Sequence, residues 1–289
     1  MIKNDLEINK YPSVPSMINY QGQYCSMDSP GKSASSLKDF NSHPIQNFDY
    51  QFNSWGFRGP EFTQYIGKPV NICLGDSILL NIGGPIEHSW PSLLAQRFDI
   101  PTLNFGMAAV GNDAILKVYK SIIDLFDVQN TFVMYSFFHR RLVNGRLEQD
   151  ASSNNEENFE YFKAHRLAGV IECALPGWSY TEEEKQFLLE QDLYFLDKPL
   201  YFSDYQGIDR KLIDKEAYKS FRGTTWPTLK QFIQGAEPHT DMYTKEFGGF
   251  VSDKNRDGYH INYNANSIYA DYFYNQWKIK NESQNITQT

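Results

Sequence analysis

The sequence lacks long apolar runs and has few cysteines, and each shortage removes a class of protein from consideration. No stretch approaches the roughly 18 apolar residues of a membrane-spanning helix, and residues 1–30 lack the apolar core of a secretory signal. The three cysteines, Cys25, Cys73 and Cys173, lie far apart, so we expect no paired-cysteine metal site. Their odd number and wide spacing favour a reduced, cytoplasmic protein.

Clustered positive charge is also missing. The net charge is −8, and neither a run of like charges nor a basic stripe is present. Because phosphate contacts need clustered Lys and Arg, we expect no nucleic-acid partner. The hydrophobic content of 41% is ordinary for a globular protein. A length of 289 residues suits one large domain, or one domain with a sizeable insertion.

Short apolar runs alternate with helical patterns in the first half of the chain. Three runs predict buried parallel strands: 70–74, 102–105 and 131–135. Between them, apolar stripes at helical spacing predict helices over 90–98 and over 112–126, the second capped by Asn112 or Asp113. This alternation predicts an α/β fold, in which helices cover both faces of a parallel sheet.

The alternation breaks after the third strand. We interpret residues from about 145 to 250 as a largely helical insertion that carries one or two sheet strands whose positions the pattern does not fix. Thr181 and Glu184 have the spacing of a capping box at a helix start. A last amphipathic helix is predicted over 268–277. Residues 1–52 are polar and rich in turn-forming residues, which indicates an irregular N-terminal arm.

Gly75-Asp76-Ser77 follows the first predicted strand, where we expect a helix to begin. Parallel-sheet proteins bind ligands at the carboxyl ends of their strands, and the free N–H groups of a helix N-terminus favour an anion. A serine there would attack an ester carbonyl while these groups hold the oxyanion. The same tripeptide is also an ordinary helix cap, so it does not indicate catalysis by itself.

A second candidate element, Asp257-Gly258-Tyr259-His260, precedes the last helix. A serine hydroxyl is a weak nucleophile at neutral pH and needs a base. A histidine serves as that base, and a carboxylate that fixes its tautomer improves it. The spacing would let Asp257 bond one ring nitrogen of His260 while the other faces Ser77. The alternative is a turn at Asp-Gly followed by a surface histidine.

Taken together, the motifs resemble the conserved blocks of the SGNH (GDSL) hydrolase family. Asn-Ser-x-Gly-Phe-Arg-Gly-Pro-Glu resembles the segment that precedes the nucleophile block. The similar segments follow the family's order and are 53–61, 68–77, 89–94, 103–112 and 257–262. The resemblance covers roughly residues 53–139 and 253–277.

This resemblance implies a fold and an activity. The fold would be a three-layer α/β/α domain with a parallel, flavodoxin-like sheet over residues 53–289. The activity would be ester hydrolysis through an acyl-enzyme, with Ser77 as nucleophile, His260 as base and Asp257 orienting the histidine. The expected substrate is an O-acylated carbohydrate or another small ester. No metal or organic cofactor is implied.

The resemblance is incomplete at the oxyanion hole. The family's second-block glycine falls on Ala109, which keeps the N–H but tolerates fewer backbone angles, and Gly106 leaves the register open. We expect the N–H groups of Ser77 and Ala109 to hold the oxyanion. The third-block asparagine is absent from 136–141. Either His139 or Arg140 substitutes as a donor, or the third donor is missing. Losing one donor typically costs about 100- to 1,000-fold in rate.

Three further residues are candidates for substrate binding: Asp76, Asn112 and Arg140. The cationic segment 139–141 suits a carboxylate, a phosphate or an acidic sugar. The alternative, which we favour slightly, is pairing of these cations with acidic residues of the insertion.

Other functions remain open at this stage. The same nucleophile could pass its acyl group to a sugar hydroxyl, which would make the protein an O-acyltransferase. A non-catalytic ligand-binding module on the same scaffold is supported by the missing asparagine and opposed by Ser77, Asp257 and His260. A flavodoxin-like nucleotide binder would need a phosphate loop after the first strand, and residues 76–80 do not supply one. The acyl group, the acceptor and the oligomeric state are not fixed by the sequence.

Overall fold

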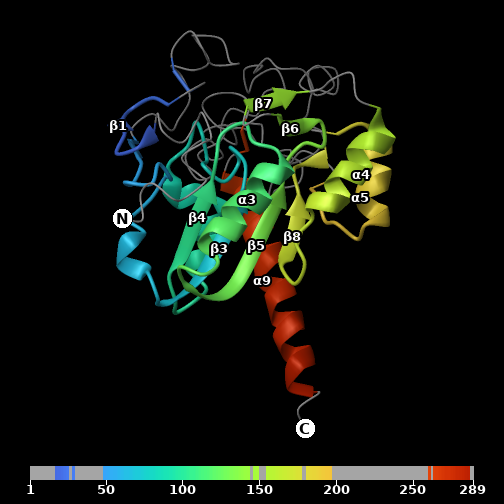
Figure 1. Ribbon diagram of the computed structural model, residues 1–289. Coiled ribbons are helices and arrows are strands. Elements are labelled where there is room, and N and C mark those ends of the chain that lie inside the picture. The colour runs from blue at the N-terminus through green and yellow to red at the C-terminus, as the bar shows by residue number, and fades with distance from the viewer. Residues whose placement is uncertain are drawn as a thin grey trace, which may run out of the picture.

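The core of the protein is a parallel sheet between two layers of helices (Figure 1). The computed structural model describes residues 17–25, 28–29, 48–143, 146–149, 154–177, 180–196, 260–261 and 263–286. Within these ranges the sheet has four strands in the order β4-β3-β5-β8. Their bounds are Thr102–Gly106 (β4), Pro69–Gly75 (β3), Asp127–Tyr135 (β5) and Ile171–Ala174 (β8).

The sheet confirms the predicted fold class. The three predicted strands correspond to β3, β4 and β5, and all neighbouring pairs are parallel. If these four strands are numbered 1 to 4 along the chain, their order across the sheet is 2-1-3-4. This is the beginning of the flavodoxin-like order of doubly wound sheets. Such a sheet has its topological switch point between the first and third strands, here β3 and β5. Ligands of doubly wound proteins bind outside the carboxyl ends of the strands at that point.

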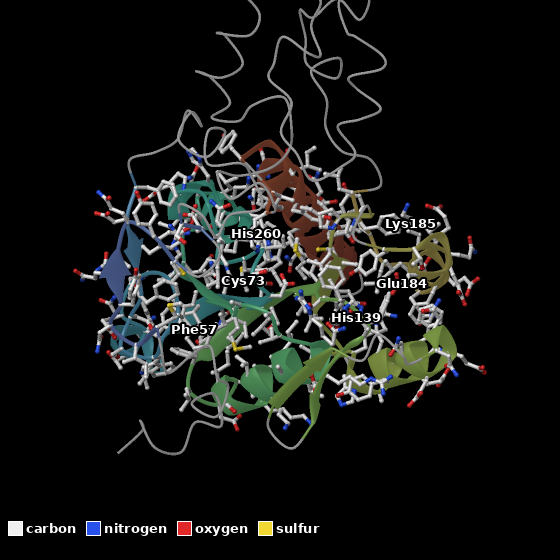
Figure 2. All side chains as sticks on the ribbon, turned by 90° about the horizontal axis from the view of Figure 1, so that it is seen from above. Phe57, Cys73, His139, Glu184, Lys185 and His260 are labelled. Atoms are coloured by element: carbon white, nitrogen blue, oxygen red, sulfur yellow. The ribbon has the colours of Figure 1, made fainter. Side chains whose placement is uncertain are left out.

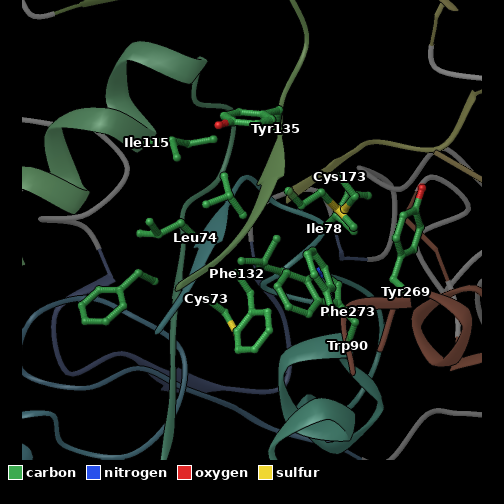
Figure 3. Packing of buried hydrophobic residues seen from close by; sticks show 14 of the residues in the cluster. Cys73, Leu74, Ile78, Trp90, Ile115, Phe132, Tyr135, Cys173, Tyr269 and Phe273 are labelled. Atoms are coloured by element: carbon green, nitrogen blue, oxygen red, sulfur yellow. The ribbon is translucent and has the colours of Figure 1, made fainter. Parts of the chain in front are cut away.

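Helices cover both faces of the sheet. One face carries α3 (Asn112–Ile122), and the other carries α2 (Trp90–Ala95) and α9 (Tyr263–Ile286), which pack against each other. Figure 3 shows Ile115 of α3 on one side of the strands, and Trp90 of α2 with Phe273 of α9 on the other. The result is the expected three-layer α/β/α arrangement.

Alternation along β3 fills both core layers. Successive strand residues point to opposite faces, so Leu74 and Cys73, both fully buried, enter different layers (Figure 3). In the α2–α9 layer, the ring of Phe273 lies 4.4 Å from that of Trp90 and 5.6 Å from that of Phe132. Because both faces are covered, the strand is apolar nearly throughout, which is the pattern that predicted it.

The described part of the chain also contains two short strand pairs and further helices. Two short antiparallel pairs are formed by β1 (Gln21–Gly22) with β2 (Tyr50–Gln51), and by β6 (Arg140–Val143) with β7 (Arg146–Gln149). The other helices are α4 (Asn155–His165), α5 (Glu182–Glu190) and two 3-10 turns, η4 (Thr63–Tyr65) and η5 (Ile86–His88). None of the helices in the described part of the chain has the length and apolar character that crossing a membrane requires.

The described part of the predicted insertion contains helices and one strand of the main sheet. Strand β8 pairs with β5, so the stretch from about 145 to 250 contributes directly to the sheet. The capping box of α5 is confirmed: the Thr181 hydroxyl accepts from the Glu184 N–H, and the Glu184 carboxylate accepts from the Thr181 N–H. Residues 197–259 lie outside the described residues.

Helix α3 differs from the prediction at both ends. Its N-cap residue is Gly111, not Asn112 or Asp113. The Asn112 side chain instead bonds the backbone of Ser136 after β5, accepting from its N–H at 2.8 Å and donating to its carbonyl oxygen at 3.2 Å. The helix ends at Ile122, so Phe126 is buried beyond it rather than on its stripe.

The segment 48–62 packs against the carboxyl edge of the sheet, so the end of the predicted arm is ordered. Tyr50 and Phe52 form a small buried cluster with Leu80 and Ile82. The Asn53 side chain closes the following loop by accepting from the N–H groups of Trp55 and Phe57, both at 3.0 Å, and by donating to Pro60 O at 2.9 Å.

All three cysteines lie in the described part of the chain, and all are buried with free thiols. Burial raises the pKa of Cys25 to about 11 and raises those of Cys73 and Cys173 well above the ordinary value of a thiol. Because the thiolate is the reactive form, these cysteines are inert packing residues at neutral pH.

Candidate active site

Ser77 lies just beyond the carboxyl end of β3, in consecutive turns over residues 76–84 that we call the Ser77 turn. The backbone bonds of this segment span three residues, from Leu79 N to Asp76 O and from Asn81 N to Ile78 O. The prediction of a helix starting at Ser77 is therefore wrong, because the first α-helix after β3 in the described chain begins at Trp90. Within the described chain, Ser77 therefore does not stand at the N-terminus of an α-helix.

Side chains from other segments donate hydrogen bonds to carbonyl oxygens of the Ser77 turn, which in a helix would accept from backbone N–H groups. Arg58 Nη1 donates to the carbonyl oxygens of Leu80 and Asn81 at 2.5 and 2.8 Å. Asn104 Nδ2 donates to Leu79 O at 2.8 Å. Asn81 itself has φ of 50°, a left-handed conformation that interrupts a right-handed helix. These long-range contacts hold the segment as turns.

Arg58 is a supporting residue to which the sequence analysis gave no role. Its side chain is 1% exposed, and its guanidinium lies 4.3 Å from the centre of the Tyr50 ring. Burial lowers its pKa, and its Nε and Nη2 have no hydrogen-bond partner among the described residues. The one sequence signal is a single cation within a segment rich in aromatic residues and glycine.

The histidine predicted as base contacts the predicted nucleophile. His260 Nε2 lies 2.8 Å from Ser77 Oγ, although the two residues are 183 positions apart. Ser77 is 8% exposed and His260 is 2% exposed. Figure 2 shows His260 near the middle of the carboxyl edge of the sheet, beside the first turns of α9. A neutral imidazole at this distance can take the hydroxyl proton.

Asp257, the predicted orienting carboxylate, lies outside the described residues. Its pairing with His260 therefore stays a prediction.

The Asp76 carboxylate is bound by the protein itself. It accepts from Ile78 N at 3.0 Å, from Ser136 Oγ at 3.1 Å and from Arg140 Nη1 at 3.3 Å, and it is 1% exposed. These contacts link the residue before the nucleophile to the end of β5. Asp76 and Arg140, which the sequence analysis assigned to substrate binding, thus form an ion pair with each other.

The other cation of the segment pairs as the alternative interpretation expected. Arg141 donates to Asn158 Oδ1 at 2.7 Å and to Glu157 Oε1 at 3.4 Å, both on α4. Arg140 pairs instead with Asp76, as described above, and its guanidinium also lies over the ring of Phe137. Asn112, the third expected substrate contact, holds the Ser136 backbone. The structure therefore gives all three residues supporting contacts.

Two of the expected oxyanion donors lie at the end of β4: Gly106 is its last residue, and Ala109 lies in the loop that follows. The Gly106 N–H is taken by Asn104 Oδ1 at 2.9 Å, which leaves Ala109 as the candidate in this loop. Ala109 has φ of 55°, a left-handed conformation that favours glycine. The residue at the family's glycine position thus keeps a glycine-like backbone in spite of its methyl group.

Replacing Ala109 with glycine is expected to raise stability. The left-handed conformation costs alanine about 1–2 kcal/mol in the folded protein, and glycine avoids this cost. Glycine also makes the unfolded chain more flexible, which offsets about 0.4–1 kcal/mol of the gain in stability. We expect Ala109→Gly to raise the melting temperature by about 1–3 °C, measured by calorimetry. Ala108→Gly is the control, since Ala108 has no positive φ, and we expect it to lower the melting temperature. Equal destabilisation by both changes would contradict this view of Ala109.

His139, one of the two substitute donors considered for the missing asparagine, lies away from His260 and towards Glu184 of α5 (Figure 2). Its ring lies tilted beside that of Phe137, with ring centres 5.4 Å apart. Burial and then the neighbouring charge of Arg140 lower its pKa, so the imidazole is mostly uncharged at neutral pH. No described contact joins it to Ser77.

The fold and the site define a doubly wound α/β protein with a buried serine–histidine pair at the switch point of its sheet. No protein-family model and no curated protein matches the chain.

Solved structures similar to this chain include the psychrotrophic esterase EstA from Pseudoalteromonas (11% identity over 74% of this chain and 98% of that one, TM-score 0.35). TesA is similar at 13% identity over 71% and 96%, with a TM-score of 0.35. A member of the lipolytic G-D-S-L family from Veillonella parvula is similar at 12% identity over 70% and 96%, with a TM-score of 0.33. At these identities and TM-scores, what the chain does has to be argued from its own site.

Proposed function

We propose that this chain is a serine ester hydrolase of the SGNH (GDSL) family, which removes O-acyl groups from a carbohydrate or another small ester. The observation that carries the proposal is the 2.8 Å contact between Ser77 Oγ and His260 Nε2 at the carboxyl edge of the sheet. A buried serine hydroxyl aligned on an imidazole is the arrangement that nucleophilic acyl transfer needs. The family assignment rests on the order of the sequence blocks around these two residues.

The proposed reaction proceeds through an acyl-enzyme. Ser77 Oγ bonds to the ester carbonyl carbon while its proton passes to His260 Nε2. The tetrahedral oxyanion accepts from the N–H groups of Ser77 and Ala109. His260 then gives its proton to the leaving alcohol as the C–O bond breaks. Water repeats the two steps and releases the acid. In this scheme Asp257 stabilises the charged imidazole.

Acyl-enzyme trapping tests this proposal. The protein is mixed with p-nitrophenyl acetate and quenched in acid within its first turnovers, and its peptides are weighed by mass spectrometry. We expect an added acetyl group on the peptide that contains Ser77. Acetylation spread over surface lysines, with none on Ser77, would contradict the mechanism and favour the non-catalytic binding module.

Burial of the site favours a second candidate, an O-acyltransferase. Ser77 and His260 expose 8% and 2% of their surface, and a site with little access to water suits transfer to a bound alcohol. The same reaction with a mixture of free sugars distinguishes the two. Hydrolysis gives acetate in proportion to released nitrophenol, whereas a transferase gives acetylated sugar at the expense of acetate.

A further inference from the structure

Asn266 lies on the buried side of the first turns of α9 and connects three segments of the active-site edge. Its side chain is fully buried. Its Oδ1 accepts from the N–H of Trp90 at 2.9 Å. Its Nδ2 donates to Asn81 Oδ1 and to Ile261 O, both at 3.2 Å.

Two of these partners adjoin the reactive groups. Asn81 belongs to the Ser77 turn, and Ile261 directly follows His260. One amide therefore bonds both the segment that carries the nucleophile and the segment that carries the base. The third partner is Trp90, the first residue of α2. The Trp90 ring packs on the ring of Phe273, which lies on α9 as Asn266 does.

The apolar packing of α9 does not fix this geometry by itself. Burial of apolar surface is non-directional, so the contact of α9 with α2 holds the helix on the sheet without setting the position of its first turn to a fraction of an ångström. Hydrogen bonds are directional and weaken steeply when misaligned. A fully buried amide that bonds both segments supplies the missing constraint, and the loss of either bond would leave a buried polar group unsatisfied.

We propose that Asn266 is a positioning residue that sets the distance between His260 Nε2 and Ser77 Oγ. The proposal rests on the proposed function, because it concerns the proton transfer between these two atoms. Asn266 touches neither reacting atom in the described contacts. It acts through Ile261 on the histidine and through Asn81 on the serine.

The first test is the rate at which a fluorophosphonate modifies Ser77, since this reaction needs the same proton transfer but no particular ester. We expect Asn266→Ala to lower the maximal rate of modification by about 10- to 100-fold, because misplacement by about 1 Å can cost about 100-fold. The inhibitor's apparent binding constant should change by less than about threefold. Asn281→Ala is the matched control, since Asn281 lies on the same helix and its side chain donates to Trp277 O, away from the active-site edge, and it should leave the rate unchanged.

A second variant removes the hydrogen bond between Asn266 and Asn81 by changing Asn81 instead. It keeps the proposal testable if Asn266→Ala does not fold. Asn81→Gly suits the positive φ of Asn81 and removes the oxygen that Asn266 bonds. We expect a slower modification of Ser77 with an unchanged apparent binding constant.

A double variant separates positioning from general structural support. In a His260→Ala background there is no base to position, so adding Asn266→Ala should reduce the modification rate by less than about twofold. An equal loss in both backgrounds would overturn the positioning role. If Ser77→Ala removes modification but Asn266→Ala and Asn81→Gly do not slow it, only the positioning role fails. If Ser77→Ala is modified as fast as the wild type, the proposed function fails and the positioning role with it.

Discussion

Ser77→Ala is expected to lower the hydrolysis of p-nitrophenyl acetate by about 10⁴- to 10⁶-fold. Ser77 Oγ is the only protein atom that forms a covalent bond to the substrate in the proposed mechanism, and an enzyme of this kind without its nucleophile keeps only oxyanion stabilisation and binding. The measurement is kcat/KM at neutral pH for wild type and variant, with the melting temperature of both. Since Ser77 Oγ contributes one buried hydrogen bond to His260, the change in stability should be about 1 kcal/mol.

Ser121→Ala is the matched control for this change. Ser121 is half-buried on α3, and its hydroxyl donates to Lys117 O of the same helix. Its removal should leave kcat/KM within about twofold of the wild type. A Ser77→Ala protein that folds and retains the wild-type rate would falsify the assignment of the nucleophile.

His260→Ala is expected to lower kcat/KM by about 10³- to 10⁴-fold or more, because the serine loses the group that removes its proton. The side chain is 2% exposed and contacts Ser77 Oγ, so its deletion should leave a space of about imidazole size beside that atom. We expect added imidazole to enter that space and restore part of the rate in a saturable way. The measurement is the rate as a function of imidazole concentration.

His165→Ala provides the control for the histidine. His165 ends α4, where its Nδ1 lies 2.7 Å from Tyr161 O, so it serves the helix rather than the site. This variant should hydrolyse at the wild-type rate and should not respond to imidazole. If His260→Ala keeps the wild-type rate, another group is the base and the short contact with Ser77 is incidental.

The sequence predicted the sheet because each core strand is buried on both faces. A mostly apolar run such as Val70–Leu74 can bury the side chains of both its faces only if helices cover both sides of the sheet. The sequence pattern therefore predicts the layered architecture. Strand β8 is only four residues long and includes Glu172, so it carried no comparable signal. The capping box of α5 was predictable for a different reason, since the side chain of each of its two residues bonds the backbone N–H of the other, three positions away.

The chemistry was predictable where it depends on residue type, and not where it depends on distant contacts. Ser77 and His260 were assigned from the groups that acyl transfer requires. The helix expected at Ser77 is absent because Arg58 and Asn104 take its carbonyl oxygens, and neither contact has a local signature. Asn266 could have been noticed as a polar residue three positions before Tyr269, on the buried stripe of α9. Its partners could not have been named without the fold.

The separation of Ser77 and His260 by 183 positions has a consequence for biosynthesis. Strands β3, β4 and β5 and the turn that holds the serine all precede residue 140, so they leave the ribosome long before the histidine is made. Domains commonly begin to fold during synthesis, and contacts between distant segments form last. A nascent chain with its sheet already assembled would thus hold an unactivated serine until α9 docks. The moment at which Ser77 becomes reactive towards a fluorophosphonate would therefore report the docking of α9, and not the earlier formation of the sheet.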